Sequence, residues 1–212
     1  MQNPLKKGRP RGFDEDAALE AALRVFWENS YEGATLADLT AAMGINRSSM
    51  YATFGDKEAL FRRVIGRYRA GQMGYFREAL AAPTAHAAIR ALLTMTVAFL
   101  AEPGHPKGCL TITGALACGP EAEPIKKAMV DARRQAEAAI RKRFALAQHD
   151  GDLAPGIDPA GLARYVASLL AGLGVQAANG ATKAEMRRVV ELALRFLTPA
   201  AIGSSESQGV PQ

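Results

Sequence analysis

The stretch GINRSSMYATFGDKEALF, residues 44–61, carries the polar side chains whose types and spacing best suit recognition of another molecule. Met50 and Phe54 fall at helical spacing and would point inward, which leaves small hydrogen-bonding side chains and one tyrosine facing outward. Small side chains on the first turn of a helix let its backbone approach base edges in a DNA major groove. The predicted outward residues are Arg47, Ser48, Ser49, Tyr51 and Thr53.

A second candidate for chemistry is Cys109, which follows Lys107 in the segment HPKGC. A place in the first turn of a predicted helix, close to a cation, favours the thiolate form of a cysteine and its reaction with electrophiles. The alternative is inert packing among apolar neighbours. Cys118 is expected to be packing, and about 13 Å along one predicted helix separates it from Cys109, too far for a disulfide.

Other kinds of site have little support in the sequence. The three histidines, His86, His105 and His149, lack metal-ligand spacing to one another or to the cysteines, so we expect no metal site. The sequence contains no nucleophile elbow, phosphate-binding loop or paired carboxylates. We therefore expect no enzyme and no cofactor.

The composition is that of a globular protein, with 49% apolar and 22% charged residues in a chain of 212. This length can hold a small module and a larger one. The longest nearly uncharged run, residues 165–179, is shorter than the roughly 18 residues that suggest a membrane span. Because no apolar stretch follows the basic N-terminus, we expect a cytoplasmic protein that does not enter a membrane.

The spacing of apolar residues predicts an all-α protein of about nine helices, because few alternating β-branched runs are present. Asp14, Thr35, Asn46 and Asp56 are the expected N-caps of the first four helices. Gly44 can adopt the positive φ that a tight turn requires. The predicted helices cover residues 14–30, 36–43, 47–53, 57–80, 84–100, 109–118, 120–148, 159–179 and 183–197.

The second and third of these helices, with the turn at Gly44 between them, are a predicted helix-turn-helix. Residues 13–61, and within them YEGATLADLTAAMGI and SMYATFGDKEALF, strongly resemble the N-terminal domain of TetR-family (TetR/AcrR-type) transcriptional repressors. The all-helical remainder resembles the family more loosely. The resemblance implies a DNA-binding domain at residues 13–66 and an effector-binding and dimerisation domain at residues 67–202.

The same resemblance implies how DNA would be contacted. The helix starts at Thr35, Asn46 and Lys57 carry partial positive charge that suits a phosphate. By the resemblance, Thr35, Tyr51 and Lys57 would contact phosphates, and Arg47, Ser48 and Ser49 would face base edges.

Two positions depart from the family pattern. Thr53 stands where the family often has a larger aromatic residue or a histidine, which leaves its DNA contact open. Ser30 stands where the family commonly has a glycine that ends the first helix. Asn29 is expected to adopt the left-handed conformation in its place, since asparagine tolerates it well.

Residues 1–12 hold four basic side chains, Lys6, Lys7, Arg9 and Arg11, and no acidic one. Ahead of a helix-turn-helix, Arg9 and Arg11 are placed to enter an A·T-rich minor groove. The alternative is an ordinary flexible, solvated arm. At the other end, residues 203–212 are expected to be a disordered tail.

A single helix-turn-helix reads few base pairs, so specificity usually requires two copies about 34 Å apart along the DNA. We therefore expect a homodimer bound to a palindromic operator in double-stranded DNA. The last two predicted helices are candidates for a four-helix interface, although the same stripes could fill the core of one chain. The candidate interface residues are Leu162, Val166, Leu170, Leu173, Met186, Val189, Val190, Leu194 and Leu197.

In the TetR family, the helices after the DNA-binding domain enclose a small-molecule pocket, and the ligand releases the DNA. The candidate lining, any member of which could instead be core, favours an apolar or aromatic effector, or an electrophile acting at Cys109. It comprises Met95, Phe99, Cys109, Leu110, Ile112, Leu116, Met129, Phe144, Tyr165 and Leu169. The alternative to a repressor is a sequence-nonspecific architectural DNA-binding protein, and activation of transcription also stays open.

Overall fold

The computed structural model describes residues 12–71, 73–115 and 119–203, which form α-helices and one 3-10 helix and contain no strand. The all-α prediction is confirmed, but the described residues hold eleven α-helices instead of about nine. They are α1 (Glu15–Gly33), α2 (Leu36–Met43), α3 (Arg47–Phe54), α4 (Lys57–Ala70), α5 (Gly74–Leu80), α6 (Ala85–Leu100), α7 (Leu110–Thr113), η1 (Pro120–Ala122), α8 (Glu123–His149), α9 (Pro159–Ala178), α10 (Lys183–Phe196) and α11 (Pro199–Ile202).

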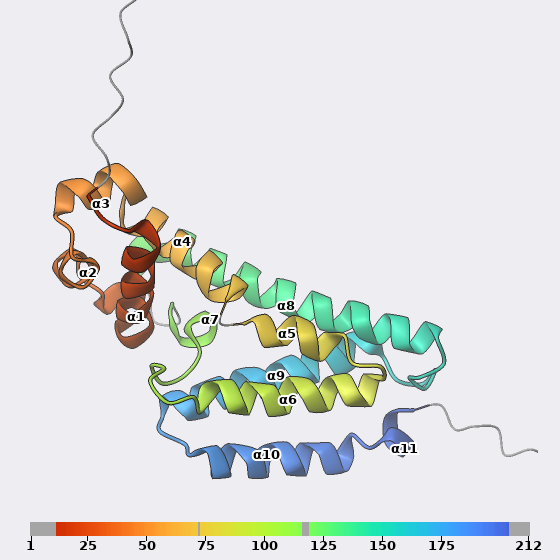
Figure 1. The fold of residues 1–212 in the computed structure, drawn as a ribbon. Helices are drawn as coiled ribbons and strands as arrows, with labels where there is room; N and C mark the ends of the chain where they lie inside the picture. The colour runs from red at the N-terminus through yellow and green to blue at the C-terminus, as the bar shows by residue number, and fades with distance from the viewer. Residues whose placement is uncertain (1–11, 72, 116–118, 204–212) are drawn as a thin grey trace, which may run out of the picture.

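Helices α1 to α3 form a small head at one end of the molecule (Figure 1). Each begins where a side chain was expected to cap it, with Asp14, Thr35 and Asn46 accepting hydrogen bonds from the first turn. Gly44 ends α2 in the left-handed conformation, at φ 65°. Met50 and Phe54 are buried, so the predicted inward side of α3 is confirmed.

The end of α1 differs from the prediction. Ser30, and not Asn29, takes the positive φ, at φ 61° and ψ 178°. Asn29 stays helical, and its side-chain amide donates to the Val25 carbonyl at 3.1 Å. The chain bends at Ser30 and continues to Gly33, so α1 is kinked rather than ended at this point.

The predicted helix over residues 57–80 is wrong, because the chain breaks into α4 and α5. Gly71 leaves the helix at φ −94° and ψ −75°, and the Met73 N–H reaches back to the Tyr68 carbonyl. A second glycine, Gly74, starts α5. Two glycines this close weaken a helix by roughly 1 kcal/mol each, which favours a turn at this point.

The helix predicted over residues 109–118 is also wrong, because α7 is a single turn. Cys109 is its N-cap and not a residue of its first turn, and Gly114 follows its last residue. Residues 116–118 lie outside the described residues. The predictions for Leu116 and Cys118 therefore have no structural counterpart.

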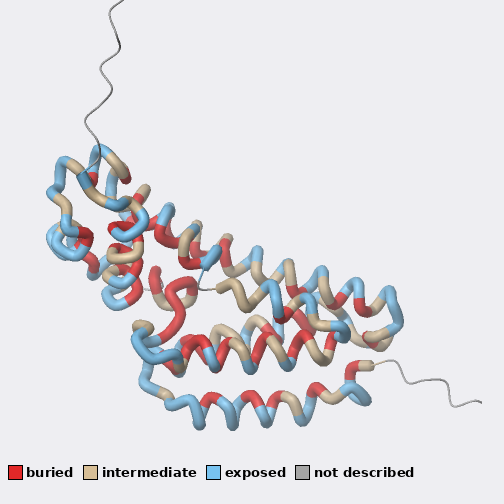
Figure 2. Tube along the Cα trace, in the orientation of Figure 1, coloured by how far each residue is buried: buried red, intermediate tan, exposed pale blue. Residues whose placement is uncertain are grey.

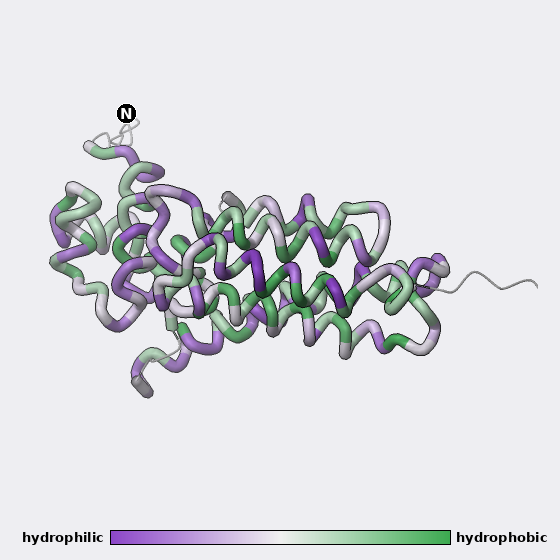
Figure 3. Tube along the Cα trace, turned by 90° about the horizontal axis from the view of Figure 1, so that it is seen from below, coloured by the Kyte–Doolittle hydropathy of each residue, from purple (hydrophilic) through white to green (hydrophobic). Residues whose placement is uncertain are grey.

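The larger part of the molecule consists of α4 to α11. Helices α6, α8 and α9 run side by side, with α10 packed on α6 on the outside of this group (Figure 1). The buried apolar residues form one connected core from α1 to α11, so the head shares packing with the rest of the molecule (Figure 2). Hydrophobic and hydrophilic residues alternate along the long helices (Figure 3), as expected of helices with one buried side.

No described helix is both long enough and apolar enough to cross a lipid bilayer.

Candidate DNA-binding surface and effector cavity

The outward side of α3 is polar, and its first turn is held in place by Asn46. The Asn46 Oδ1 accepts hydrogen bonds from the Ser49 backbone N–H at 2.8 Å and from the Ser48 hydroxyl at 2.7 Å. Arg47 and Ser48 are exposed, and Tyr51 is 49% exposed. Ser49 and Thr53 are half-buried, so they offer less surface to a partner than the sequence pattern implies.

Two further predicted contact residues flank α3. The Thr35 hydroxyl donates to the Asp38 carboxylate at 2.6 Å, and this hydrogen bond lowers the pKa of Asp38. Lys57, the first residue of α4, places its Nζ 4.6 Å from the centre of the Tyr31 ring. Arg9 and Arg11 lie outside the described residues.

Ion pairs that the sequence pattern did not reveal also join the head to α4. Arg67 of α4 donates to Glu20 at 2.9 Å and to Asp16 at 2.8 Å, both on α1. The hydrogen bond to Glu20 is the main reason that the pKa of Arg67 is raised. These pairs join the first two turns of α1 to the last turn of α4.

A cavity of about 810 Å³ lies among α4, α5, α6, α7, α8 and α9. Three of the predicted lining residues, Phe99, Cys109 and Ile112, lie in its wall.

The other predicted lining residues that the structure describes lie elsewhere. Leu110, Met129 and Phe144 are fully buried in the core, because they face neighbouring helices and not the cavity. Met95 and Leu169 pack half-buried against the core, and Tyr165 is exposed on the outside of α9. The helical spacing of such residues indicates that they lie on an apolar side of a helix. It does not indicate whether that side packs against another helix or lines a cavity.

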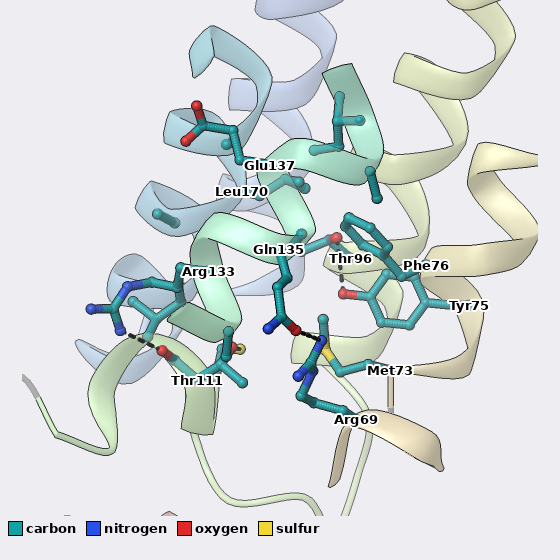
Figure 4. Close-up of a pocket in the computed structure, with 18 of the residues that line it drawn as sticks. Arg69, Met73, Tyr75, Phe76, Thr96, Thr111, Arg133, Gln135, Glu137 and Leu170 are labelled. Atoms are coloured by element: carbon teal, nitrogen blue, oxygen red, sulfur yellow. Dashed lines mark hydrogen bonds between the residues drawn. The ribbon is translucent and has the colours of Figure 1, made fainter. Parts of the chain in front are cut away.

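The cavity has a polar side that the sequence did not predict (Figure 4). Arg133 of α8 donates to the Thr111 carbonyl of α7 at 2.7 Å, and Arg69 of α4 donates to Gln135 at 3.0 Å. The Tyr75 and Thr96 hydroxyls lie 3.1 Å apart, and burial raises the pKa of Tyr75. These residues are far apart in sequence, and only the fold brings them together.

Cys109 is a buried residue of the cavity wall. Its Sγ accepts a hydrogen bond from the Tyr68 hydroxyl at 3.3 Å and lies 3.1 Å from the Thr111 hydroxyl. Lys107 is exposed. The thiol therefore has two hydroxyl neighbours and lies within electrostatic range of Arg133 in the same cavity wall, and the helix that follows it has only one turn.

Most of the predicted interface residues belong to the core of their own chain. Leu162, Val166, Leu173, Met186, Val190 and Leu197 are buried, Leu170 lines the cavity and Leu194 is half-buried. Only Val189 is exposed. The buried predicted residues of α10 lie on the side of the helix that packs on α6. A different set of residues therefore faces outward from α10. The exposed large apolar residues of α9 and α10 are Tyr165, Val175, Val189, Leu192 and Phe196.

The segment from residue 104 to 119 connects the cavity wall to the head. The Trp27 indole N–H donates to the Gly108 carbonyl at 3.1 Å, and the Tyr31 backbone N–H donates to the Gly114 carbonyl at 2.9 Å. The Gly119 N–H donates to the Glu32 carboxylate at 3.0 Å, and the Arg24 guanidinium donates to the Gly104 carbonyl at 3.3 Å. Among the described residues, four hydrogen bonds thus join α1 to the segment that contains α7.

Comparison with known proteins identifies the family to which the chain belongs. The model described as "Bacterial regulatory proteins, tetR family" matches residues 18–64. The model described as "Tetracyclin repressor-like, C-terminal domain" matches residues 85–193, about half of the chain. The chain belongs to the TetR family. The family resemblance inferred from residues 13–61 is therefore confirmed.

Individual relatives match three quarters or more of the chain. A cysteine mutant of the TetR family transcriptional regulator CifR, solved in complex with 26-bp double-strand operator DNA, is 41% identical, with a TM-score of 0.87 over 90% of this chain and 100% of that one. The transcriptional repressor ComR of Escherichia coli K12 is 28% identical over 90% of this chain and 91% of its own length. The uncharacterised regulator YezE of Bacillus subtilis 168 is 33% identical over 75% and 83%.

Proposed function

We propose that this TetR-family protein is a transcriptional repressor that binds a palindromic operator as a homodimer and is released by a small molecule. The observation that carries the proposal is the outward polar side of α3, held by Asn46 at the end of the molecule (Figure 1). A complex of the similar regulator CifR with operator DNA supports it. In this proposal residues 13–66 read DNA, and residues 67–202 bind the effector and the second subunit.

The residues predicted to contact DNA would make two kinds of contact, to base edges and to phosphates. Arg47 and Ser48 would reach base edges in the major groove, and the Ser48 hydroxyl would give up its hydrogen bond to Asn46 to do so. Thr35, Tyr51 and Lys57 would hold phosphates on either side, with Ser49 and Thr53 closer to the core. Arg9 and Arg11 would add minor-groove contacts.

The outward stripe of α9 and α10 would form the dimer interface. Its large apolar members include Phe196, which is 70% exposed in the single chain, and Leu192, which is 55% exposed. Burying such residues against a second copy removes apolar surface from water. Two helices from each subunit would then make a four-helix interface.

The cavity would hold the effector, and repression would be relieved because the effector binds the DNA-free form more tightly. A second mode is an electrophile that alkylates Cys109, because this thiol lies in the cavity wall. Alkylation would add atoms between Cys109 and Tyr68. The named relatives are regulators, so we treat the cavity as a binding site and not as a catalytic centre. The protein would work in the cytoplasm, on the nucleoid.

In vitro selection of random DNA duplexes by the purified protein, in parallel with Tyr51→Ala, tests the proposal. We expect the wild type to enrich a palindrome, with a preference over random DNA of roughly 10³ or more, and the variant to lose it. Salt-sensitive binding to all duplexes, with no enriched site, would instead favour a sequence-nonspecific architectural protein.

A further inference from the structure

The cavity carries an excess of positive charge that an apolar effector would not use. Among the described residues that line it, four are arginines, Arg69, Arg77, Arg133 and Arg164, and Glu137 is the one acid. Glu137 already accepts a hydrogen bond from Arg164 at 2.7 Å. Arg69, Arg77 and Arg164 are exposed, and Arg133 is half-buried. An anion that enters this partly enclosed space would therefore meet several cations, of which Arg133 is the least screened by solvent.

Arg133 is the most informative of the four. It is half-buried, and its guanidinium donates to a neutral oxygen, the Thr111 carbonyl. Loss of hydration by burial lowers the pKa of Arg133, which indicates that its charge is incompletely compensated. A carboxylate would be a stronger partner, because it can accept two parallel hydrogen bonds from the planar guanidinium.

The remainder of the cavity wall is apolar. Figure 4 shows the rings of Tyr75 and Phe76 across the cavity from Arg133, with Gln135 and Arg69 between the two sides. Phe99, Leu100 and Ile140 belong to the same wall. A ligand that fits both parts has a negatively charged head and an apolar body.

We infer that the effector is an amphiphilic organic carboxylate, whose head group pairs with Arg133 and Arg69 and whose apolar body packs against Phe76 and Phe99. This inference rests on the proposed function, since it names the chemical class of the effector.

The position of Arg133 also provides a route from the cavity to the head. A carboxylate that pairs with the Arg133 guanidinium would pull it away from the Thr111 carbonyl. This movement would break the hydrogen bond that joins α7 to α8. Immediately after α7, the Gly114 carbonyl accepts the N–H of Tyr31, and the Tyr31 ring lies beneath Lys57. A shift of α7 would therefore move Tyr31, and with it Lys57, which is proposed to bind a DNA phosphate.

Calorimetric titration of the full-length dimer with three probes that each carry a ten-carbon chain tests the inference. Decanoate carries the carboxylate, decan-1-ol is its neutral counterpart and decyltrimethylammonium its cationic counterpart. We expect decanoate to bind at least about tenfold more tightly than decan-1-ol, because hydrogen bonds to a charged group are stronger than those to a neutral one. The cation should bind most weakly. Decan-1-ol binding as tightly as decanoate, or no binding of decanoate, would overturn the inference.

Arg133→Gln locates the head group. This substitution removes the charge but keeps a donor for the Thr111 carbonyl, and we expect it to weaken decanoate binding at least about tenfold without changing decan-1-ol binding. Arg134→Gln is the matched control, because Arg134 is the exposed neighbour on the same helix and does not line the cavity. If Arg133→Gln does not fold, Arg133→Lys keeps the charge and should weaken decanoate binding less than tenfold. Unchanged decanoate affinity in Arg133→Gln would contradict the pairing of the carboxylate with Arg133.

Operator binding separates this inference from the proposed function. Decanoate should weaken operator binding by the wild type and by Arg134→Gln, and should have little effect on Arg133→Gln. If the wild type selects no operator, the repressor proposal fails whatever the calorimetry shows. If it selects an operator but decanoate neither binds nor releases it, the carboxylate inference fails alone.

Discussion

The backbone N–H of Tyr31, the residue after the kink in α1, donates a hydrogen bond to the carbonyl of Gly114 at 2.9 Å. Eighty-three positions separate the two residues, and they join the head to the segment that lies against the cavity. The Tyr31 ring also packs edge-on to Phe61 at 5.1 Å and supports Lys57. One residue thus contacts the segment after α7, the buried Phe61 of α4 and the lysine proposed to bind DNA.

The kink itself should be strained. Ser30 is the one non-glycine residue with positive φ in the described part of the chain, and its φ and ψ fall in a region that essentially only glycine occupies. We expect Ser30→Gly to raise the free energy of unfolding by about 1 kcal/mol and the melting temperature by about 2–4 °C. Thermal denaturation would measure this. Ser30→Ala is the control, because alanine relieves no strain; a gain in Ser30→Ala equal to that in Ser30→Gly would contradict the explanation.

Tyr51 is predicted to act through its hydroxyl. Tyr51→Phe should leave the melting temperature unchanged, because the side chain is about half exposed, and should weaken operator binding by about tenfold because it removes a hydrogen bond to a charged phosphate. Fluorescence anisotropy with labelled operator would measure the affinity. Thr94→Val removes an exposed hydroxyl from α6, outside the proposed DNA-binding, cavity and interface residues, and should bind DNA as the wild type does. Equal affinities of all three proteins would exclude a phosphate contact by Tyr51.

The basic arm should contribute mainly to the salt dependence of binding. Deleting residues 1–12 removes Lys6, Lys7, Arg9 and Arg11. We expect weaker operator binding and a slope of log affinity against log salt that is shallower by roughly 0.9 for each phosphate that the arm neutralises in the wild type. Titrations at several salt concentrations would give the slope. An unchanged affinity and slope would leave the arm as a solvated tail.

The dimer interface can be tested with two leucines of equal exposure. Leu192 on α10 and Leu146 on α8 are each 55% exposed, but only Leu192 belongs to the proposed interface stripe. Leu192→Asp would bury an unpaired charge from each subunit and should raise the dimer dissociation constant by at least about a hundredfold. Leu146→Asp should stay dimeric. Sedimentation equilibrium would distinguish them, and similar dimerisation of both variants would place the interface elsewhere.

The helix-turn-helix could be predicted from sequence because local signals determine it. Asp14, Thr35 and Asn46 cap their helices as expected, and Gly44 makes the turn. The break at Gly71 could not be predicted in the same way, since a continuous helix and a broken one satisfy the same apolar spacing.

The cavity was harder to predict for a related reason. Met129 and Phe144 carry the same sequence signal as Phe99, and only tertiary packing decides that two fill the core and one faces an open space. Arg69 and Arg133 were missed because arginines on helices usually face solvent. Their approach to one cavity depends on how α4 and α8 cross, which no local pattern encodes.

The indole of Trp27 gives the molecule an optical property of its own. It is the single tryptophan of the chain, buried against Tyr68 and Phe99 and hydrogen-bonded to the Gly108 carbonyl. Phe99 lines the cavity, and Gly108 precedes Cys109 and α7. Emission from this one residue therefore reports on the junction between cavity and head, and a titration followed at its wavelength needs no attached dye.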